Sequence, residues 1–456
     1  MGVLSEVAHP LNSVWKLISQ VPLFMLFRAV DWPKMLPINY TLSLLYTCNS
    51  RCLTCNIWTK HVNNFSVDEY DATFKSVGET PFWFTLSGGE PFLRQDIVDI
   101  CKVIYRNCKP GIINIPTNAS LYDVIPSAVE EICKYCTETQ VVINISIDAV
   151  GTRHDWIRGF PGNFEKAMKT YKHLKEMSLP NLTIGIHSVI SRFNLEDLED
   201  LVNFVESAKP DSFITEIAEE RIELDTVGSP ITPNLMDYEA AIDYVMSRIQ
   251  NMSFKKIGIF TRFFRGHYYE LVKQILRKRE QVIPCYAGWA SCQISPDGDV
   301  WPCCIRGQSI GNLRKHNYNF PSIWFSAHAR EIRNSIRKKE CYCTLANAHY
   351  TNILMNPLIL LKKVPRHNQG YYQVTSRPPF MREAKFKQIQ ESIMRINNSR
   401  QEMVRGIRFK ADTTFEADAR FKCLCGTRIS VQRGQPLPTC IQCGRADWWR
   451  LEAVLE

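Results

Sequence analysis

Residues 38–55, INYTLSLLYTCNSRCLTC, determine how the rest of the chain is interpreted. The apolar, β-favouring run over 38–46 predicts a buried strand. Three cysteines follow it directly: Cys48, Cys52 and Cys55. Three thiolates on one loop can hold three irons of a cubane cluster, which leaves the fourth iron open to another ligand. The stretch therefore predicts a strand that ends in a metal site.

The alternation of a strand and a helix recurs after this stretch. Further helices are expected over 67–78, 97–107, 123–136, 163–178 and 196–207, and strands over 81–88, 111–118, 141–148, 182–190 and 211–218. Repeats of this length predict an α/β fold with a parallel sheet and helices outside it. About 200 residues are too few for an eight-fold barrel, which takes roughly 250. We therefore predict a partial (β/α)6 TIM-like barrel.

The chain has 456 residues, which is enough for two or three domains. We expect an N-terminal helical segment, a barrel, an auxiliary domain and a small C-terminal module, joined by linkers. The predicted boundaries are 1–36 (apolar and helical), 37–235 (partial barrel), 236–283 (helical linker), 284–345 (cysteine-rich auxiliary domain), 346–415 (irregular or helical linker) and 416–456 (zinc-ribbon or rubredoxin-like module).

Composition narrows the class of protein. A net charge of +9 is spread along the chain, which argues against a dedicated nucleic-acid binder. The 17 cysteines are an odd number in tight clusters, which indicates metal ligands in a reducing, cytoplasmic setting rather than disulfides. No apolar run is long enough to span a membrane. The apolar residues 14–30 predict a short helix pair packed on the core. The alternative is a segment that contacts a membrane surface or covers a hydrophobic substrate.

Two further motifs complete a resemblance to a known family. SGGEP (87–91) ends the second predicted strand, and ISID (145–148) ends the fourth. Together with the cysteine triad they resemble the radical S-adenosylmethionine (SAM) superfamily over roughly residues 38–220. The resemblance implies a [4Fe–4S] cluster on the triad, with SAM chelating the open iron. It also implies that Gly88, Gly89 and Glu90 bind the methionine amine of SAM.

Physical chemistry agrees with the expected SAM contacts. Glycines let a backbone approach a ligand closely, and a carboxylate such as that of Glu90 is a natural partner for an ammonium. Ser146 and Asp148 are expected near the ribose, although Asp148 is equally suited to capping a strand end. The stretch SIDAVGTRHDWIRG also nominates His154, Asp155 and Arg158. Where the family often has an aromatic residue, this chain has Thr54, and Trp58 is the candidate to contact adenine instead.

A second set of cysteines lies between 285 and 343. Cys285, Gly298 and Cys303 fit a C-x12-G-x4-C pattern, which resembles the SPASM/twitch extension of radical SAM enzymes. That resemblance implies auxiliary [4Fe–4S] chemistry. Six cysteines suit one auxiliary cluster, with Cys285, Cys303, Cys341 and Cys343 as ligands and with Cys292 or Cys304 able to replace one of them. A structural zinc site is the alternative interpretation.

A third set ends the chain. Cys423, Cys425, Cys440 and Cys443 form two knuckles, which is typical of a zinc ribbon or a rubredoxin-like module. Both Zn²⁺ and mononuclear iron accept four thiolates in a tetrahedron, and zinc is the favoured prediction.

These motifs predict a radical SAM enzyme. Its reaction is expected to be an oxidation or the formation of a C–C or C–X bond. The resemblance implies reductive cleavage of SAM, hydrogen abstraction from a substrate C–H bond, and an electron donor of the flavodoxin or ferredoxin type. The expected substrate is a small molecule, such as a sugar or nucleotide derivative, or a lipid. The alternatives are a peptide- or protein-modifying maturase and, in another class, a non-catalytic protein that binds metal or nucleic acid.

Overall fold

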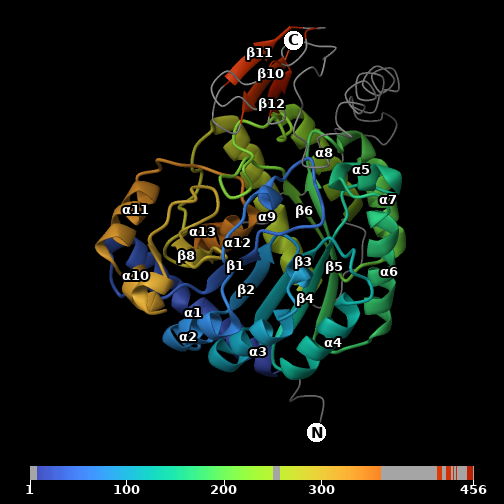
Figure 1. Cartoon of the computed structure of the whole chain (residues 1–456). Helices are drawn as coiled ribbons and strands as arrows, with labels where there is room; N and C mark the ends of the chain where they lie inside the picture. Colours follow the sequence, from blue (N-terminus) through green and yellow to red (C-terminus); the bar gives the residue numbers. More distant parts are fainter. Residues whose placement is uncertain are drawn as a thin grey trace. The chain divides into compact units, whose positions relative to one another are not determined.

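The computed structural model describes residues 8–249 and 257–360, and parts of the C-terminal region at 419–423, 428–432, 435, 438 and 449–454. The chain divides into two compact units, residues 1–380 and 381–456. The first unit is shown with its helices and strands labelled in Figure 1.

The first unit is built on a nine-stranded sheet in the order β6-β5-β4-β3-β2-β1-β7-β8-β9. Strands β1 to β6 all pair in parallel, as a βα repeat requires. Their bounds are β1 (Asn39–Leu45), β2 (Trp83–Gly88), β3 (Ile112–Thr117), β4 (Gln140–Ser146), β5 (Leu182–Ile190) and β6 (Ser212–Ile217). This arrangement confirms the predicted α/β fold with a partial barrel.

Helices connect these strands and cover the sheet (Figure 1). Around the sheet they are α2 (Val67–Val77), α3 (Ile97–Cys108), α4 (Ile125–Tyr135), α5 (Thr152–Arg158), α6 (Asn163–Glu176) and α7 (Leu198–Ala208). For α2, local sequence explains where the helix begins. Ser66 and Glu69 form a reciprocal capping box that starts α2.

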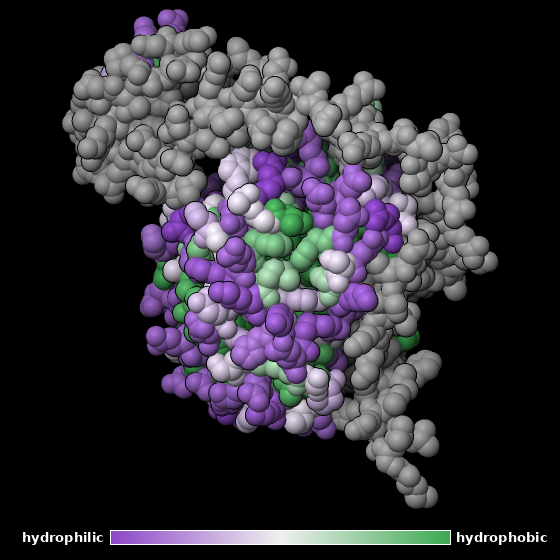
Figure 2. All heavy atoms as spheres, turned by 90° about the vertical axis from the view of Figure 1, so that its right-hand side faces the viewer, coloured by the Kyte–Doolittle hydropathy of each residue, from purple (hydrophilic) through white to green (hydrophobic). Residues whose placement is uncertain are grey.

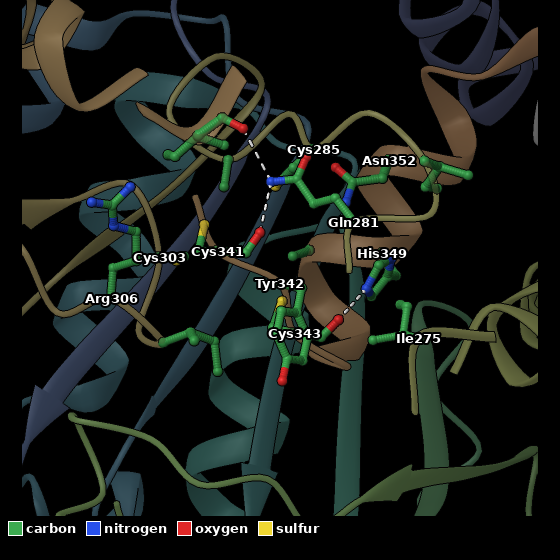
Figure 3. A pocket seen from close by; sticks show the side chains of 15 residues that line it. Ile275, Gln281, Cys285, Cys303, Arg306, Cys341, Tyr342, Cys343, His349 and Asn352 are labelled. Atoms are coloured by element: carbon green, nitrogen blue, oxygen red, sulfur yellow. Dashed lines mark hydrogen bonds between the residues drawn. The ribbon is translucent and has the colours of Figure 1, made fainter. Parts of the chain in front are cut away.

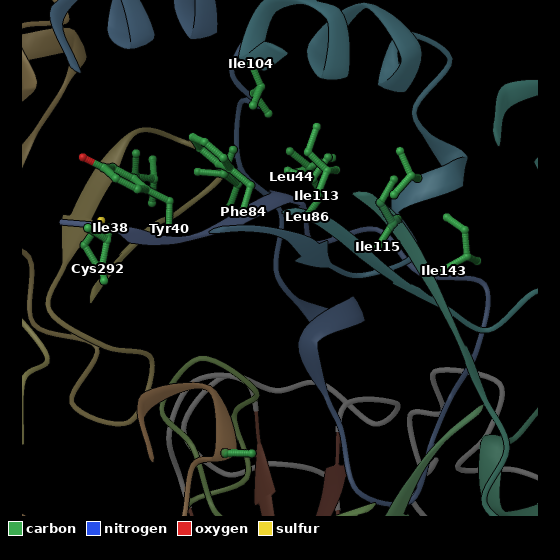
Figure 4. Packing of buried hydrophobic residues seen from close by; sticks show 14 of the residues in the cluster. Ile38, Tyr40, Leu44, Phe84, Leu86, Ile104, Ile113, Ile115, Ile143 and Cys292 are labelled. Atoms are coloured by element: carbon green, nitrogen blue, oxygen red, sulfur yellow. The ribbon is translucent and has the colours of Figure 1, made fainter. Parts of the chain in front are cut away.

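Side chains on both faces of the sheet form the core, as expected for parallel strands covered by helices. Tyr40 of β1 stacks on Phe84 of β2, with ring centroids 5.4 Å apart. Figure 4 shows these two residues with Leu86, Ile113 and other buried apolar residues of neighbouring strands. The continuous apolar runs of the strands are therefore what the sheet buries.

The predicted auxiliary domain continues the same sheet. Its first strand, β7 (Ser291–Ile294), pairs in parallel with β1 and aligns Cys292 with Tyr40. Strands β8 (Asp299–Trp301) and β9 (Gly311–Asn312) follow in antiparallel pairs. The six-stranded barrel therefore gains three strands from residues 291–312. This continuity was not part of the prediction from sequence.

Further helices surround this extension or lead into it. They are α8 (Leu235–Ile249), α9 (Ile257–Lys278), α10 (Phe320–Trp324), α11 (Ala327–Arg337), α12 (Ala346–Leu354) and α13 (Pro357–Leu360). The 3-10 turns are Ile57–Thr59, Pro91–Leu93, Leu195–Asp197 and Arg314–His316. Helices α8 and α9 occupy the range predicted as a helical linker.

The apolar N-terminal stretch forms one helix, α1 (Ala8–Val30), where a helix pair was expected. The prediction was wrong because Pro22 lies within the helix and does not end it. One side of the helix is held by buried Val21, Phe24 and Phe27. Tertiary packing of this kind routinely overrides local propensity. None of the described helices is long and apolar enough to cross a membrane.

Figure 2 shows the face of the molecule that lies on the right in Figure 1, where α6 and α7 are found. Hydrophilic side chains cover most of its described surface and surround a smaller hydrophobic patch. This is the ordinary pattern for amphipathic helices whose apolar side faces a core.

The second unit contains a three-stranded antiparallel sheet in the order β11-β10-β12. The strands are β10 (Ala419–Cys423), β11 (Arg428–Val431) and β12 (Trp449–Val454).

Candidate active site

The cysteine triad lies on the loop that follows β1, at the carboxyl edge of the parallel sheet. Two backbone hydrogen bonds fix this loop to the end of α5, from Arg51 N to Arg158 O and from Leu53 N to Ile157 O, both 2.9 Å. The backbone N–H of Ser50 donates to Cys48 Sγ at 3.4 Å. Protein contacts alone thus fix the loop, so that its cysteines are positioned before a metal binds.

The three thiols share one half-buried environment. Burial and, after it, the neighbouring Cys52 raise the pKa of Cys48 and of Cys55 to about 12. Without a metal these thiols stay protonated at neutral pH, so iron must displace their protons when it binds. Three soft sulfur donors brought together on one loop fit three corners of a [4Fe–4S] cluster.

The Gly-Gly-Glu motif leaves β2 directly beside this loop. Gly88 has φ +111, and a Cβ there would lie 2.2 Å from Leu45 O. A Cβ on Gly89 would lie 2.0 Å from Thr47 O. Both positions therefore exclude a side chain, because the motif packs backbone against backbone on the residues just before Cys48.

Glu90 is buried, and hydrogen bonds already engage its carboxylate. Thr117 Oγ1 donates to Oε1 at 2.7 Å, and the backbone N–H of Asn118 donates to Oε2 at 2.8 Å. Phe92 N–H donates to Oε1 at 3.2 Å. These contacts tie β2 to the end of β3. Three donors therefore already engage the carboxylate to which the sequence assigned the ammonium of SAM.

Asn118 is a residue of this edge that the motifs did not reveal. Its amide donates to Asn49 Oδ1 at 2.7 Å and to Ser50 Oγ at 3.0 Å. Asn49 in turn donates to Ser120 Oγ at 2.9 Å. The network connects the end of β3 to the cysteine loop. Its signal in the sequence was only its position, since Asn118 ends the predicted strand 111–118.

Arg158 connects the triad to the end of β4. Its Nη1 donates to Cys52 Sγ at 3.6 Å and lies 3.3 Å from Asp148 Oδ2. Burial opposes the positive charge, but Cys52 and Asp148 raise the pKa of Arg158 above its ordinary value. Its Nε is buried and has no hydrogen-bond partner within the described part of the chain. A cation beside a cluster thiolate balances part of its negative charge.

Asp148 is also held by the backbone, since Val189 N–H donates to its Oδ1 at 2.8 Å. His154 is fully buried, accepts from Asp148 N at 3.2 Å and faces Asn163 Oδ1 at 3.1 Å. Burial lowers the pKa of His154 to about 4, so the ring is neutral. Asp155 accepts from the N–H groups of Gly162 and Phe164 at the start of α6. His154 and Asp155 therefore support the fold around Asp148.

Two other predicted contacts lie at the same edge. Ser146 is half-buried and ends β4. Trp58 stacks on Arg51, whose guanidinium carbon lies 4.3 Å from the ring centroid. Trp58 is therefore next to the triad loop, and its ring is engaged by Arg51.

A second sulfur site is enclosed by the auxiliary segment. Four cysteines line one pocket: Cys285, Cys303, Cys341 and Cys343. Figure 3 shows them around the same space, with apolar neighbours such as Ile275. Burial raises the pKa of Cys303 to about 12 and that of the other three above the ordinary value. The set that the sequence proposed for one auxiliary cluster thus lies together.

The spacing of these sulfurs bears on which metal they suit. Among the described residues, no three His, Cys, Asp or Glu side chains converge closely enough for one metal ion. A single zinc ion draws its sulfurs to about 4 Å from one another, because each Zn–S bond is about 2.3 Å. A cubane spreads its ligands over four irons. Four cysteine side chains around one pocket match the number of ligands that such a cluster takes.

Polar groups fix the segments that carry these cysteines. Gln281 donates to the carbonyls of Ile336 and Cys341, both at 3.0 Å (Figure 3). His349 Nε2 lies 2.9 Å from Cys343 O. Arg306 lines the pocket and lowers the pKa of Cys341, although burial raises it more. A fixed shell of this kind orients metal ligands.

The two remaining cysteines of the segment lie elsewhere. Cys292 is buried in the core beside Ile38 and Tyr40 (Figure 4). Cys304 is buried close to Arg221, Glu223 and Glu219. Neither side chain lines the four-cysteine pocket.

Charged side chains that the motifs missed gather at the ends of β5 and β6. His187 Nε2 lies 3.5 Å from Glu216 Oε1, and Arg221 Nη2 lies 3.8 Å from Glu216 Oε2. Although burial opposes it, His187 and Arg221 lower the pKa of Glu216. The three side chains remain 18%, 21% and 20% exposed for His187, Glu216 and Arg221. All three side chains are therefore only partly exposed.

The loop after β6 runs between the two sulfur sites. Asn56 N–H, beside Cys55, donates to Leu224 O at 2.9 Å. Glu219 Oε1 accepts from the N–H of Thr344, beside Cys343, at 2.5 Å. Glu223 accepts from Ser43 and Gln293, both at 2.5 Å. We call residues 218–231 the bridging loop, since it contacts neighbours of both cysteine sets.

The third cysteine set is not open to the same test. The side chain of Cys423, at the end of β10, and residues Cys425, Cys440 and Cys443 lie outside the described residues.

Comparison with known families supports the two sulfur sites. Residues 42–205 match the model of the radical SAM superfamily, and residues 285–344 match SPASM, an iron-sulfur cluster-binding domain. These ranges contain the triad and the four-cysteine pocket respectively.

Individual relatives are distant. The antilisterial bacteriocin subtilosin biosynthesis protein AlbA of Bacillus subtilis is 22% identical over 68% of this chain and 66% of its own length, just under two thirds. The AdoMet-dependent heme synthase of Nitratidesulfovibrio vulgaris is 27% identical over 63% of this chain and 78% of its own.

A solved structure supports the fold. Streptococcus suis SuiB bound to S-adenosylmethionine is similar at a TM-score of 0.52 and 17% identity, over 68% of this chain and 70% of that chain. The same protein bound to precursor peptide SuiA gives a TM-score of 0.50 and 18% identity, over 68% and 69%.

Proposed function

We propose that this chain, a radical SAM enzyme with a SPASM domain, modifies a peptide or a protein. AlbA is named for bacteriocin biosynthesis, and SuiB was solved with a precursor peptide. These similarities favour the peptide alternative over the small molecule or lipid that the sequence led us to expect.

The observation that carries the proposal is a set of polar groups on and beside the bridging loop. Glu219 Oε2 and Arg221 Nε are buried without a hydrogen-bond partner among the described residues. A lipid chain placed there would leave them unpaired, which costs about 1–3 kcal/mol for each group. Peptide groups supply a donor and an acceptor at every residue. A peptide therefore satisfies both kinds of group.

A heme precursor is the second candidate, because the heme synthase has the higher identity at 27%. The charge of the lining argues against it. Glu216, Glu219 and Glu223 surround one guanidinium, that of Arg221. Tetrapyrrole precursors carry several carboxylates, which three neighbouring glutamates would repel.

The residues divide between cofactor and substrate. In the proposal Cys48, Cys52 and Cys55 hold the SAM-binding cluster. Backbone oxygens of Gly88 and Gly89, rather than the Glu90 carboxylate, receive the methionine ammonium. Ser146 and Asp148 face the ribose, and Arg158 holds Asp148 and Cys52 in place. Such a cluster, when bound, supplies the one-electron reduction of SAM that yields a radical able to remove a substrate hydrogen.

Other groups are needed around this centre. Cys285, Cys303, Cys341 and Cys343 hold the auxiliary cluster in the proposal, and a flavodoxin- or ferredoxin-type protein supplies electrons. At Cys423, Cys425, Cys440 and Cys443 we propose zinc. Metal analysis of the chain from residue 1 to 456, after reconstitution with iron, checks the zinc and the iron separately.

The experiment is anaerobic turnover of the reconstituted enzyme with dithionite, SAM and candidate precursor peptides encoded near its gene. We expect 5′-deoxyadenosine and a peptide mass that is lower by two hydrogen atoms. Arg221→Gln should keep SAM cleavage and lose at least about tenfold in peptide modification, since one hydrogen bond to a charged group contributes roughly 1.5–3 kcal/mol. Stimulation of 5′-deoxyadenosine release by a lipid or tetrapyrrole, and by no peptide, would overturn the proposal.

A further inference from the structure

The outer side of α1 is apolar although it is exposed. From Leu17 to Phe27 the helix carries no charged residue. Its exposed side chains include Ile18 at 46%, Leu23 at 42%, Leu26 at 40% and Val30 at 61%. Pro22, Met25 and Ala29 lie on the same side. A helix packed on a globular core normally has a polar outer side.

The opposite side of α1 is already used by the core. Val21, Phe24 and Phe27 are buried, and Phe27 meets Phe325 edge to face at 6.4 Å. Figure 1 places the helix at the edge of the first unit, beside α10. The face in Figure 2, by contrast, is covered mainly by hydrophilic side chains. The two apolar sides of α1 therefore need two different partners.

Aromatic and basic groups flank the C-terminal end of this helix. Trp32 is 67% exposed. Arg337 of α11 donates to the carbonyls of Arg28 and Ala29 at 3.1 and 2.9 Å. Arg330 and Lys34 both reach Asp31, at 3.0 and 2.7 Å. The exposed surface therefore changes from apolar to basic side chains within about one turn of the C-terminal end of α1.

The basic groups outnumber the acidic ones at this end. The exposed residues Lys338 and Lys339 follow Arg337 directly. Together with Lys34 and Arg330 they give five basic side chains, against the acidic Asp31, Glu331 and Glu340. A net positive rim beside an apolar helix face and an exposed tryptophan complements an anionic lipid surface.

We propose that α1 docks the enzyme on an anionic membrane surface. The helix lies in the plane of the interface, with Leu23, Leu26 and their neighbours at the acyl boundary. Trp32 lies at the level of the head groups, and the basic side chains of α11 face lipid phosphates. The contact is peripheral, and it does not rest on the identity of the enzyme's substrate.

Docking would also orient the auxiliary segment. Arg28 of α1 donates from Nε to Cys285 O at 2.9 Å. Its guanidinium lies over the rings of Tyr286 and Trp289, at 5.5 and 5.4 Å from their centroids. The helix is thus fixed to the residues that surround one pocket cysteine. A membrane-bound α1 would hold this side of the enzyme near the lipid.

The test is co-flotation of the reconstituted enzyme with vesicles. Vesicles of phosphatidylcholine alone are compared with vesicles that also contain phosphatidylglycerol. The variant Leu23→Gln/Leu26→Gln changes only the exposed side of α1 and leaves Val21, Phe24 and Phe27 in place. Met236→Gln/Val124→Gln is the matched control, because it removes two apolar side chains that are 78% and 49% exposed elsewhere.

We expect binding to the anionic vesicles only, weakened by salt. Leu23→Gln/Leu26→Gln should lower the partition coefficient at least about tenfold, and the control should leave it unchanged. Lys338→Gln/Lys339→Gln should lower it up to about thirtyfold. Equal binding of wild type and Leu23→Gln/Leu26→Gln, or no binding of either, overturns the proposal. So does a wild-type dimer that the same variant converts to monomer, since a second copy would then cover α1.

Discussion

The two sulfur sites of the first unit differ in how the chain builds them. The triad comes from one loop of eight residues, 48–55, next to a strand end where two glycines pack directly against the backbone that precedes the loop. The pocket cysteines come from three places, at 285, 303 and 341–343, and they enclose a space with apolar walls.

This difference separates two tasks. Three proposed ligands on one loop leave one iron for an outside molecule, whereas four around one pocket leave none. The open site suits a cluster that binds SAM, and the closed site suits one that only carries electrons or holds the fold. The following changes should therefore affect the two sites unequally.

The largest effect is expected from Cys48→Ala. It removes one of the three proposed ligands, and no other cysteine of the triad loop can replace it. 5′-Deoxyadenosine should become undetectable, and iron should fall from about eight to about four per chain. Iron analysis and product chromatography measure both. Cys133→Ala, at a buried cysteine of α4, is the control; retained SAM cleavage in Cys48→Ala would refute the assignment of the triad.

Cys303→Ala should separate the sites most clearly. Iron should again fall to about four per chain, but SAM cleavage should persist while substrate modification is lost. The melting temperature should drop too, since metal-ligand bonds hold three distant segments together. Cys292→Ala should leave the iron content unchanged. If Cys292→Ala lost as much iron as Cys303→Ala, the pocket would have the wrong ligand set.

An intermediate effect is expected from Arg158→Gln. The change leaves Asp148, 3% exposed, without its cation, which costs about 3–5 kcal/mol for a buried pair. It also removes the hydrogen bond to Cys52. Denaturant unfolding should show the loss of stability, and the KM for SAM should rise while the auxiliary iron stays bound. Arg158→Lys should recover part of the stability and part of the affinity for SAM. Equal losses in Arg158→Gln and Arg158→Lys would limit the role of Arg158 to packing.

The smallest effect concerns the contact between α2 and the auxiliary segment. Arg314 Nε donates to Glu69 Oε1 at 2.6 Å, and this bond, together with weaker contributions from Ser66 and Tyr318, lowers the pKa of Glu69 to about 2. A carboxylate with a lowered folded pKa stabilises the fold above its unfolded value of 4.5, and the effect is lost as pH falls toward 2. Glu69→Gln should lower the melting temperature at pH 7 by about 2 °C. Thermal scans should show that the difference in melting temperature between wild type and Glu69→Gln vanishes near pH 2. A difference that stays constant with pH would argue against the lowered pKa of Glu69.

Local patterns predicted most of the fold. The strand expected over 182–190 is β5, and the other five barrel strands differ from expectation by one or two residues at their ends. Continuous apolar runs between turn residues are enough for this. The pairing of β7 with β1 was missed because it joins residues about 250 positions apart, and no local periodicity encodes a partner at that distance.

The candidate site divides in the same way. The triad and the glycines are contiguous motifs, so their proximity follows from strand ends that share one edge. The role of Glu90 could not be read from its motif, because its partners Thr117 and Asn118 come from another strand. His187, Glu216 and Arg221 have no motif at all. Their only signal is that two of them sit on predicted strands and the third just beyond one.

The position of β1 between β2 and β7 has a consequence for the order in which the protein is made. The strand that precedes the triad remains an edge strand until residues 291–294 leave the ribosome, about 250 residues later. At 5–20 residues per second this takes roughly 10–50 s. Through that interval β1 offers unpaired backbone groups that other strands can pair with. The nascent barrel therefore needs protection on the side of β1, and its last barrel neighbour arrives with the auxiliary segment.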